Sequence, residues 1–292
     1  MKPAPFAYHD PTLIGEAVAI LAKFENARPL AGGQSLVPMM NFRYAAPDHL
    51  VDLNGIEALR GVDVGASLSF GAMTRQRDVE FSTDVAQACP ILIAALRHVG
   101  HRQTRNRGTI GGSLCHLDPA AETPAIMMLH DAVLTTQSAS GTRDLPMSEF
   151  ALGFMTSALE PDELLTRISF EPWAQTHGWG FAEYARRHGD FAIASAGVLL
   201  TLDARGAIAR FAMVIGGLGP VPVRLADFEA QALGATPDDD FIKAAANAAA
   251  SVEAMDDAHV SARYRQHLAG VLSARALRQA LACAAQRSLQ HA

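Results

Sequence analysis

The sequence predicts an α+β protein with two domains. Helix-like and strand-like runs are mixed along its 292 residues, and no internal repeat is present. A run with proline and tryptophan, Glu171-Pro172-Trp173, has the composition of a linker. An alanine-rich tail from about Pro237 to Arg287 predicts helices that cap the second domain. We therefore expect one domain over residues 1–175 and another over residues 176–292.

The elements follow from local patterns, in chain order. Thr12 precedes an apolar run with helical spacing, and Glu16 lies near the first turn, so we expect a helix over residues 12–25 capped by Thr12. Short β-branched or apolar runs predict strands, and longer apolar runs predict helices. The expected strands are residues 50–53, 68–71, 132–136, 163–170, 193–203 and 207–216. The other expected helices are a short turn from Leu36, residues 74–80, 86–99 and about 124–130, and the alanine-rich tail.

Charge and hydropathy narrow the class of protein. The formal net charge is −6 and 49% of the residues are hydrophobic, which predicts a packed core and argues against nucleic-acid binding. No uninterrupted apolar run is long enough to span a bilayer. The first residues, Met1-Lys2-Pro3-Ala4-Pro5, lack the apolar core of a signal peptide, so we expect a cytoplasmic protein.

The three cysteines, Cys89, Cys115 and Cys283, are odd in number and widely spaced. They form neither a disulfide framework nor a metal-ligand spacing. An iron–sulfur cluster takes about four thiolates, so we expect no cluster on this chain by itself.

Two glycine pairs carry the main functional signal. The first is in Ala31-Gly32-Gly33-Gln34-Ser35-Leu36, and the second is in Thr109-Ile110-Gly111-Gly112-Ser113. A glycine pair removes two Cβ atoms and permits positive φ, so successive backbone N–H groups can converge on one anion. One such pair is a common turn, but two of them predict a clamp on a ligand with two phosphates. Arginines precede the second pair, which fits either a phosphate neighbourhood or an ion-paired loop; they are Arg97, Arg102, Arg105 and Arg107.

Familiar nucleotide and hydrolase motifs are absent. The sequence has neither G-x-G-x-x-G nor G-x-x-x-x-G-K-[ST], which disfavours a nicotinamide or nucleoside-triphosphate site. It also lacks H-E-x-x-H and G-x-S-x-G. A phosphate clamp with few acid–base residues is typical of a protein whose cofactor performs the chemistry.

Five segments, in order along nearly the whole chain, make this reading specific. They are Ala31 to Pro38, Gln103 to Ser113, Asp118 to Glu122, Pro161 to Leu165, and Ala185 to Ala192. Together they resemble the FAD-binding medium subunit of the molybdenum hydroxylases, the family of carbon monoxide dehydrogenase and xanthine dehydrogenase. The resemblance implies an FAD-binding PCMH-type (vanillyl-alcohol-oxidase-like) domain of two α+β subdomains. A smaller carboxy-terminal domain with an antiparallel sheet is expected to follow.

The resemblance also implies a set of FAD-binding residues. The first loop is expected to wrap the pyrophosphate, and the second to approach the pyrophosphate and the flavin, with Ile110 as an apolar wall. Glu122 is expected to hold the adenosine ribose, and Gly100 to lie close to the cofactor. Leu164 and Leu165 match positions that contact FAD, although they read equally as strand core. The implied set is Ala31, Gly32, Gly33, Gln34, Ser35, Leu36, Gly100, Thr109, Ile110, Gly111, Gly112, Ser113, Glu122, Leu164 and Leu165.

One position departs from the family pattern. Many relatives carry a lysine near the flavin pyrimidine edge just before the Ala-Arg-Arg segment, whereas this chain reads Phe181-Ala182-Glu183-Tyr184. A cation at that edge would stabilise an anionic reduced flavin, so the flavin potential stays open.

By resemblance, the chain is the electron-transfer subunit of a heterotrimer. Molybdopterin is expected on a large partner and iron–sulfur clusters on a small partner, in a dimer of heterotrimers. The enzyme alternative is a self-contained FAD-dependent oxidase or reductase, for which His101 and His188 are the candidate acid–base residues. The non-enzyme alternative is an assembly protein that has lost FAD, which the intact glycine pairs disfavour.

Overall fold

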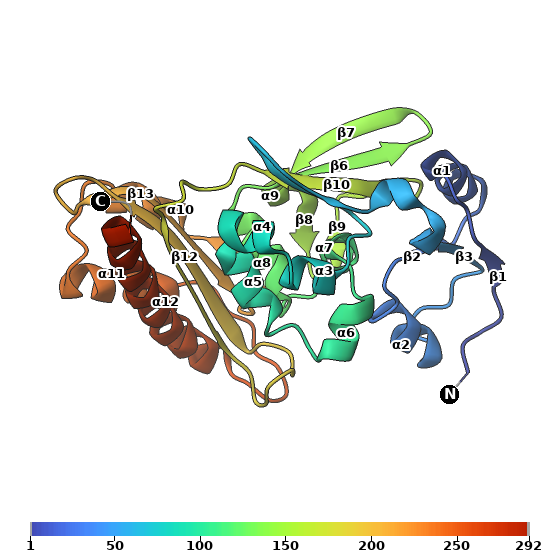
Figure 1. The fold of residues 1–292 in the computed structure, drawn as a ribbon. Helices are drawn as coiled ribbons and strands as arrows, with labels where there is room; N and C mark the ends of the chain where they lie inside the picture. The colour runs from blue at the N-terminus through green and yellow to red at the C-terminus, as the bar shows by residue number, and fades with distance from the viewer. Residues whose placement is uncertain (1, 291–292) are drawn as a thin grey trace.

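A small parallel sheet forms one end of the molecule (Figure 1). The computed structural model describes residues 2–290. In the strand order β1-β3-β2, β3 (His49–Asp52) lies between β1 (Ala7–His9) and β2 (Ala27–Leu30). Helix α1 (Ile14–Lys23) links β1 to β2 and buries Ala17, Val18 and Leu21, whose spacing puts them on one face. This face closes the N-terminal core.

The predicted first helix is present, but its cap differs. Leu13, not Thr12, is the N-cap residue. The Glu16 carboxylate accepts hydrogen bonds from the backbone N–H groups of Thr12 at 3.0 Å and Leu13 at 3.2 Å. Thr12 as the cap is therefore wrong, because a side chain from within the first turn satisfies these donors instead.

An antiparallel sheet of five strands forms the middle of the molecule, with helices below it in the view of Figure 1. Its order is β4-β5-β10-β6-β7, so the predicted strands β5, β6 and β10 lie in its centre. The strands are β4 (Val62–Val64), β5 (Leu68–Gly71), β6 (Val133–Ser138), β7 (Gly141–Pro146) and β10 (Leu164–Phe170). The helices are α3 (Gln76–Glu80), α4 (Thr83–Ala88), α5 (Pro90–Leu96), α6 (Arg102–Arg107), α7 (Ile110–His116), α8 (Glu122–Leu129) and α9 (Met147–Phe150).

Five short elements complete this half of the chain. The 3₁₀ turns η1 (Leu53–Gly55) and η2 (Glu57–Leu59) join the two sheets, and α2 (Leu36–Asn41) follows β2. Strands β8 (Ala151–Gly153) and β9 (Thr156–Ser157) form a separate hairpin.

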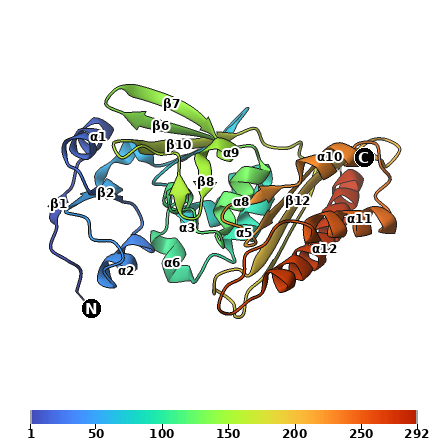
Figure 2. The same ribbon diagram turned by 180° about the vertical axis from the view of Figure 1, so that it is seen from behind.

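The other end of the molecule is an antiparallel sheet of order β11-β12-β13-β14, with helices α11 and α12 beside it (Figure 2). Strand β12 is buried on both faces: Val198 belongs to the core beneath the C-terminal helices, whereas Leu199 belongs to the central core. This explains its continuous apolar sequence. The elements are β11 (Gly178–Tyr184), β12 (Ala194–Leu202), β13 (Ile208–Gly216), β14 (Val223–Arg224), α10 (Ala226–Ala232), α11 (Asp239–Ala250) and α12 (Ala262–Gln290).

Helix α12 lies so close to β11 that two strand positions have no room for a side chain. A Cβ built on Gly178 would overlap the carbonyl of Ala280, and one on Gly180 would overlap the carbonyl of Ala276. We call this contact the glycine seam. It holds a helix backbone against a strand backbone, an approach that only glycine permits.

The α+β class and the antiparallel sheet of the carboxy-terminal half are confirmed. The helix expected over residues 86–99 is shorter and preceded by a separate helix, because Pro90 starts α5. The tail is two helices, α11 and α12, with a connection over residues 251–261. The elements that were not predicted are strands β1, β2, β4, β7, β8, β9, β11 and β14 and helices α6, α7, α9 and α10. Among residues 2–290, no helix is both long enough and apolar enough to cross a membrane.

Candidate functional site

The first glycine loop leaves the end of β2 and leads directly into α2. Gly33 has a φ of +74°, a conformation that favours glycine, and Ser35 is the N-cap residue of α2. Within the described part of the chain, the N–H groups of the five residues from Gly32 to Leu36 have no hydrogen-bond acceptor. Ser35 and Leu36 start α2, where free N–H groups are usual, and Gly32 to Gln34 extend this run of donors into the loop. Together they form a surface suited to an anion.

Three of these five residues, Gly32, Gly33 and Gln34, border a cavity of about 240 Å³. The cavity lies between the first loop and the residues after β3, with one arginine from the end of α6. Its walls are Leu30, Ala31, Gly32, Gly33, Gln34, Val37, Asp52, Asn54 and Arg107. We call it the loop cavity.

The loop cavity has both signs of charge. Arg107 is exposed, and within residues 2–290 its guanidinium makes no ion pair. Burial acts to raise the pKa of Asp52, but hydrogen bonds from Tyr8 and Asn54, together with the charge of Arg107, hold that pKa below its ordinary value. Asp52 is therefore an occupied acceptor, and Arg107 is the free cation at the cavity.

The second glycine pair has a different conformation. Thr109 is the N-cap residue of α7, and its hydroxyl accepts a hydrogen bond from the N–H of Gly112 at 3.0 Å. Gly111 and Gly112 thus lie in the first turn of a helix, and neither has positive φ. A Cβ on Gly111 would lie 2.6 Å from the Cβ of Ala72, so this glycine is required by packing.

The N–H groups of this second segment already have partners. Ile110 donates to the carbonyl of Thr74 at 3.0 Å, and Gly111 donates to the carbonyl of Ala72 at 2.9 Å. Gly112 and Ser113 donate to Thr109, as expected for a capped helix. The expectation that this pair offers free donors to an anion is therefore wrong.

The two glycine segments nevertheless meet. A Cβ on Gly32 would overlap the carbonyl oxygen of Arg107 and lie 2.8 Å from the Cα of Gly108. A Cβ on Gly112 would lie 3.3 Å from the Cβ of Ala31. The second segment is thus the wall against which the first loop rests.

The remaining predicted residues lie at different depths. Ile110 is fully buried in the central core. Leu164 and Leu165 are consecutive on β10 and point to opposite faces, Leu164 into the N-terminal core and Leu165 into the central core. Gly100, with a φ of +46°, lies in the turn between α5 and α6. The side chains of Ile110, Leu164 and Leu165 therefore pack in cores in this structure.

Glu122 is the first residue of α8 and is buried, with 6% of its surface exposed. Burial, and secondly the charge of Glu183, raise the pKa of Glu122 to about 8. The carboxyl group is therefore protonated at neutral pH and can donate as well as accept a hydrogen bond.

Glu183 lies near the end of β11. Its Oε1 is 3.5 Å from Nδ1 of His98, and its Oε2 is buried without a hydrogen-bond partner among the described residues. The alternative acid–base candidates His101 and His188 are both exposed, on connections outside the helices and strands.

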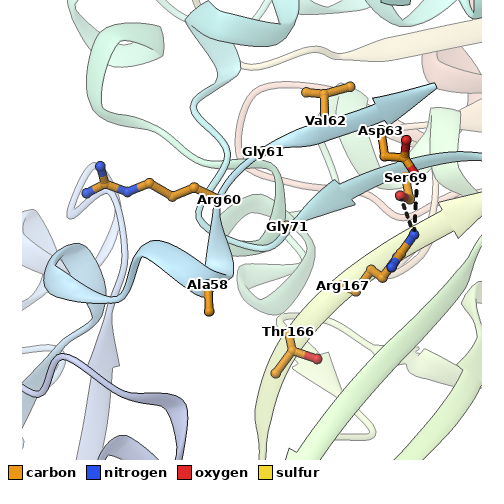
Figure 3. A pocket seen from close by; sticks show the side chains of 9 residues that line it. All are labelled: Ala58, Arg60, Gly61, Val62, Asp63, Ser69, Gly71, Thr166 and Arg167. Atoms are coloured by element: carbon orange, nitrogen blue, oxygen red, sulfur yellow. Dashed lines mark hydrogen bonds and ion pairs between the residues drawn. The ribbon is translucent and has the colours of Figure 1, made fainter.

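A second cavity, of about 260 Å³, lies on the five-stranded sheet (Figure 3). Arg167 donates a hydrogen bond to Ser69 at 2.7 Å, and Arg60 extends away from it. None of the predicted site residues lines this cavity. Among the described residues, no group of three or more His, Cys, Asp or Glu side chains could hold a metal ion.

Comparison with known proteins identifies the class. Residues 4–173 match the family described as the FAD binding domain in molybdopterin dehydrogenase, and residues 179–280 match the CO dehydrogenase flavoprotein C-terminal domain. The chain belongs to the family of FAD-binding medium subunits of the molybdenum hydroxylases. It is accordingly a flavoprotein subunit of an oxidoreductase.

Individual relatives match over almost their whole length. The chain is 36% identical to the 6-hydroxypseudooxynicotine dehydrogenase complex subunit alpha of Paenarthrobacter nicotinovorans, covering 96% of each chain. It is 34% identical to the carbon monoxide dehydrogenase medium chain of Hydrogenophaga pseudoflava, covering 97% of this chain and 99% of that one. A solved structure of carbon monoxide dehydrogenase from the same organism superposes with a TM-score of 0.94 at 35% identity, covering 97% and 99% of the two chains.

Proposed function

We propose that the first glycine loop binds the pyrophosphate of FAD. The five free N–H groups from Gly32 to Leu36 carry this proposal, because they match the oxygen acceptors of a diphosphate and have no other partner. Arg107 supplies a positive charge on the same cavity. The residues present thus fit the cofactor that the family binds.

The second segment contributes shape. With its N–H groups occupied, Thr109 to Ser113 can hold the first loop in place and offer it a rigid wall. We propose the same FAD-binding set as the sequence predicted, with this division of roles. Gly100, Glu122, Leu164 and Leu165 stay in the set as predictions.

When bound, FAD accepts electrons one or two at a time and passes them on. We propose that this chain is the electron-transfer subunit of a molybdenum hydroxylase. It would link iron–sulfur clusters on a small partner to an external acceptor, while molybdopterin is held by a large partner. The dimer of heterotrimers, the domain division at residue 175 and the cytoplasmic location stay predictions.

The relatives' names support this division of labour. One is named for carbon monoxide and another for a nicotine derivative, yet both match this chain over nearly their whole length. Such different substrates on similar flavin subunits favour a substrate site on another subunit.

The test is to isolate the tagged chain from its native cell and analyse the product by visible absorption, metal analysis and mass spectrometry. We expect flavin bands together with iron, molybdenum and two further subunits. Flavin in a lone chain without metals would instead favour the self-contained flavoenzyme. A complex without flavin would contradict the FAD assignment.

A further inference from the structure

Arg75, just before α3, connects the two glycine segments and was not predicted from the sequence. One guanidinium nitrogen donates to the backbone carbonyl of Arg107, and the other donates to Oδ1 of Asn54. Asn54 in turn donates from Nδ2 to the carbonyl of Ala31 at 3.1 Å. A continuous series of hydrogen bonds therefore runs from Ala31 in the first glycine loop to Arg107, two residues before the second segment.

We call this series of hydrogen bonds the Arg75–Asn54 strap. It ends at the carbonyl groups of Ala31 and Arg107, close to where the first loop touches the residues before the second segment. The carbonyl of Arg107 that Arg75 binds is the atom that a Cβ on Gly32 would overlap. The strap thus spans the contact between Gly32 and Arg107. It fixes one wall of the loop cavity relative to the other.

The strap is also anchored on its far side. The Asp52 carboxylate accepts from the backbone N–H of Asn54 at 2.9 Å, and Arg60 donates to the carbonyl of Asn54. These two contacts fix the backbone of Asn54, while Ala31 and Arg75 bind the Nδ2 and Oδ1 atoms of its side chain. Because its partners are fixed in this way, the Asn54 side chain can set the distance between the first glycine loop and Arg75.

Three guanidinium groups lie close together here. Burial, and then the charges of Arg107 and Arg60, lower the pKa of Arg75. Like charges held together cost free energy unless an anion lies nearby. The charges of Asp78 and Asp52 act on this pKa in the opposite direction, and Arg60 forms an ion pair with Glu57 at 3.0 Å. Arg107 is therefore the guanidinium on the loop cavity that has no ion pair among residues 2–290 and can attract an anion.

We propose that Arg75 and Asn54 are positioning residues for the diphosphate of the cofactor. They hold the first glycine loop against the second segment, so that the free N–H groups from Gly32 to Leu36 stay aligned before FAD arrives. This inference rests on the proposed function, because it assigns the strap to the same site. Neither side chain needs to touch FAD for this role.

The test compares Arg75→Gln and Arg75→Lys with the full wild-type chain, by titrating flavin-free protein with FAD and following flavin fluorescence. We expect both variants to raise the Kd for FAD about tenfold, as the loss of a charge-assisted hydrogen bond implies. Lysine keeps the charge but cannot bridge two acceptors in the fixed geometry of a guanidinium. Full affinity in Arg75→Lys would overturn the strap and leave only a charge effect.

A matched control is Arg77→Gln. Arg77 lies two residues further on, and it donates to Oδ1 of Asn106 at 3.1 Å on the exposed surface. We expect this variant to keep wild-type affinity for FAD. An equal loss in Arg75→Gln and Arg77→Gln would overturn the proposal, because the effect would then belong to α3 in general.

A double-mutant cycle with Asn54→Ala gives a readout that general destabilisation does not produce. Since either change breaks the same strap, the effects of Arg75→Gln and Asn54→Ala on the Kd should not add. Additive effects, or losses that follow the melting temperature of the flavin-free variants, would overturn the inference. If the wild-type chain itself bound no FAD, the proposed function would fail; binding with unaffected variants would contradict the strap alone.

Discussion

Gly32 and Gly33 lie at the rim of a cavity, whereas Gly111 and Gly112 lie in the first turn of helix α7. The first pair has free N–H groups and one positive φ, and the second has bonded N–H groups and helical backbone. The same dipeptide thus meets two different needs. In the first loop glycine exposes backbone to a ligand, and in the second it lets backbone pack against backbone.

The largest expected effect comes from Gly111→Val. A Cβ at this position would lie 2.6 Å from both the Cβ and the carbonyl oxygen of Ala72, so the branched side chain should lower the free energy of unfolding by about 3 kcal/mol. Denaturant unfolding of the flavin-free chain measures it. Gly153→Val is the matched control, since nothing lies within 4 Å of a Cβ there. Normal stability with selective loss of FAD would break the comparison between the two pairs.

Gly32→Ala should weaken FAD binding strongly and change the stability of the flavin-free chain only slightly, the reverse of Gly111→Val. Its Cβ would push the first loop away from Arg107, so we expect the Kd for FAD to rise about thirtyfold. The free energy of unfolding of the flavin-free chain should change less than in Gly111→Val, because the loop surface can move. Gly15→Ala, in helix α1 with open space at its Cβ, is the control for an added methyl group. Unchanged FAD affinity in Gly32→Ala would contradict the pyrophosphate assignment.

Glu122→Gln tests whether the buried carboxyl group of Glu122 makes the stability of the folded chain depend on pH. With a pKa of about 8 in the folded chain against an ordinary 4.5, Glu122 ionises in the unfolded chain first. Between these two values the wild-type stability should therefore fall as pH rises, by at most about 1.4 kcal/mol per pH unit from this group, and level off above pH 8. The glutamine variant removes this slope, so its advantage over wild type should grow from pH 5 to pH 8.

The same variant tests the cofactor role of Glu122. An amide still accepts one hydrogen bond, so FAD binding should weaken only modestly. Unfolding curves at several pH values, together with an FAD titration at pH 7, separate the two effects. A parallel pH slope in both proteins would show that Glu122 ionises normally, and complete loss of FAD would show a larger role than we assign.

The smallest expected effect is that of Arg107→Gln. Arg107 is exposed, so its attraction for a diphosphate is screened by solvent, and we expect about a fivefold rise in the Kd for FAD. The difference from wild type should shrink at high salt. Arg97→Gln is the control, because Arg97 is exposed in the same basic run but does not line the cavity. A salt-independent loss would point to a steric cause.

The sequence predicted the elements whose signals are local. Gly33 and the start of α2 follow from a short run of residues, and β10 follows from its β-branched pattern. For the second glycine pair, the sequence suggested a loop with free N–H groups, whereas Gly111 and Gly112 lie in the first turn of α7 with bonded N–H groups. Its N–H partners, Thr74 and Ala72, lie far back in the sequence, so no local pattern shows that its donors are occupied.

The strap and strand β11 were missed for a related reason. Asn54 and Arg75 are ordinary polar residues until the fold brings them to Ala31 and Arg107. Strand β11 follows the predicted linker and contains glycines, which weaken any strand pattern. Only the position of α12 explains why glycine is needed there.

The glycine seam has a consequence for how this chain can vary. In a library that randomises every glycine codon, Gly178 and Gly180 should accept almost no replacement, because even a methyl group would collide with the α12 backbone. Gly15 and Gly65, where a Cβ would meet nothing within 4 Å, should accept many. Gly178 and Gly180, which do not line the loop cavity, would then be as intolerant of replacement in such a selection as a binding motif, although their constraint comes from packing alone.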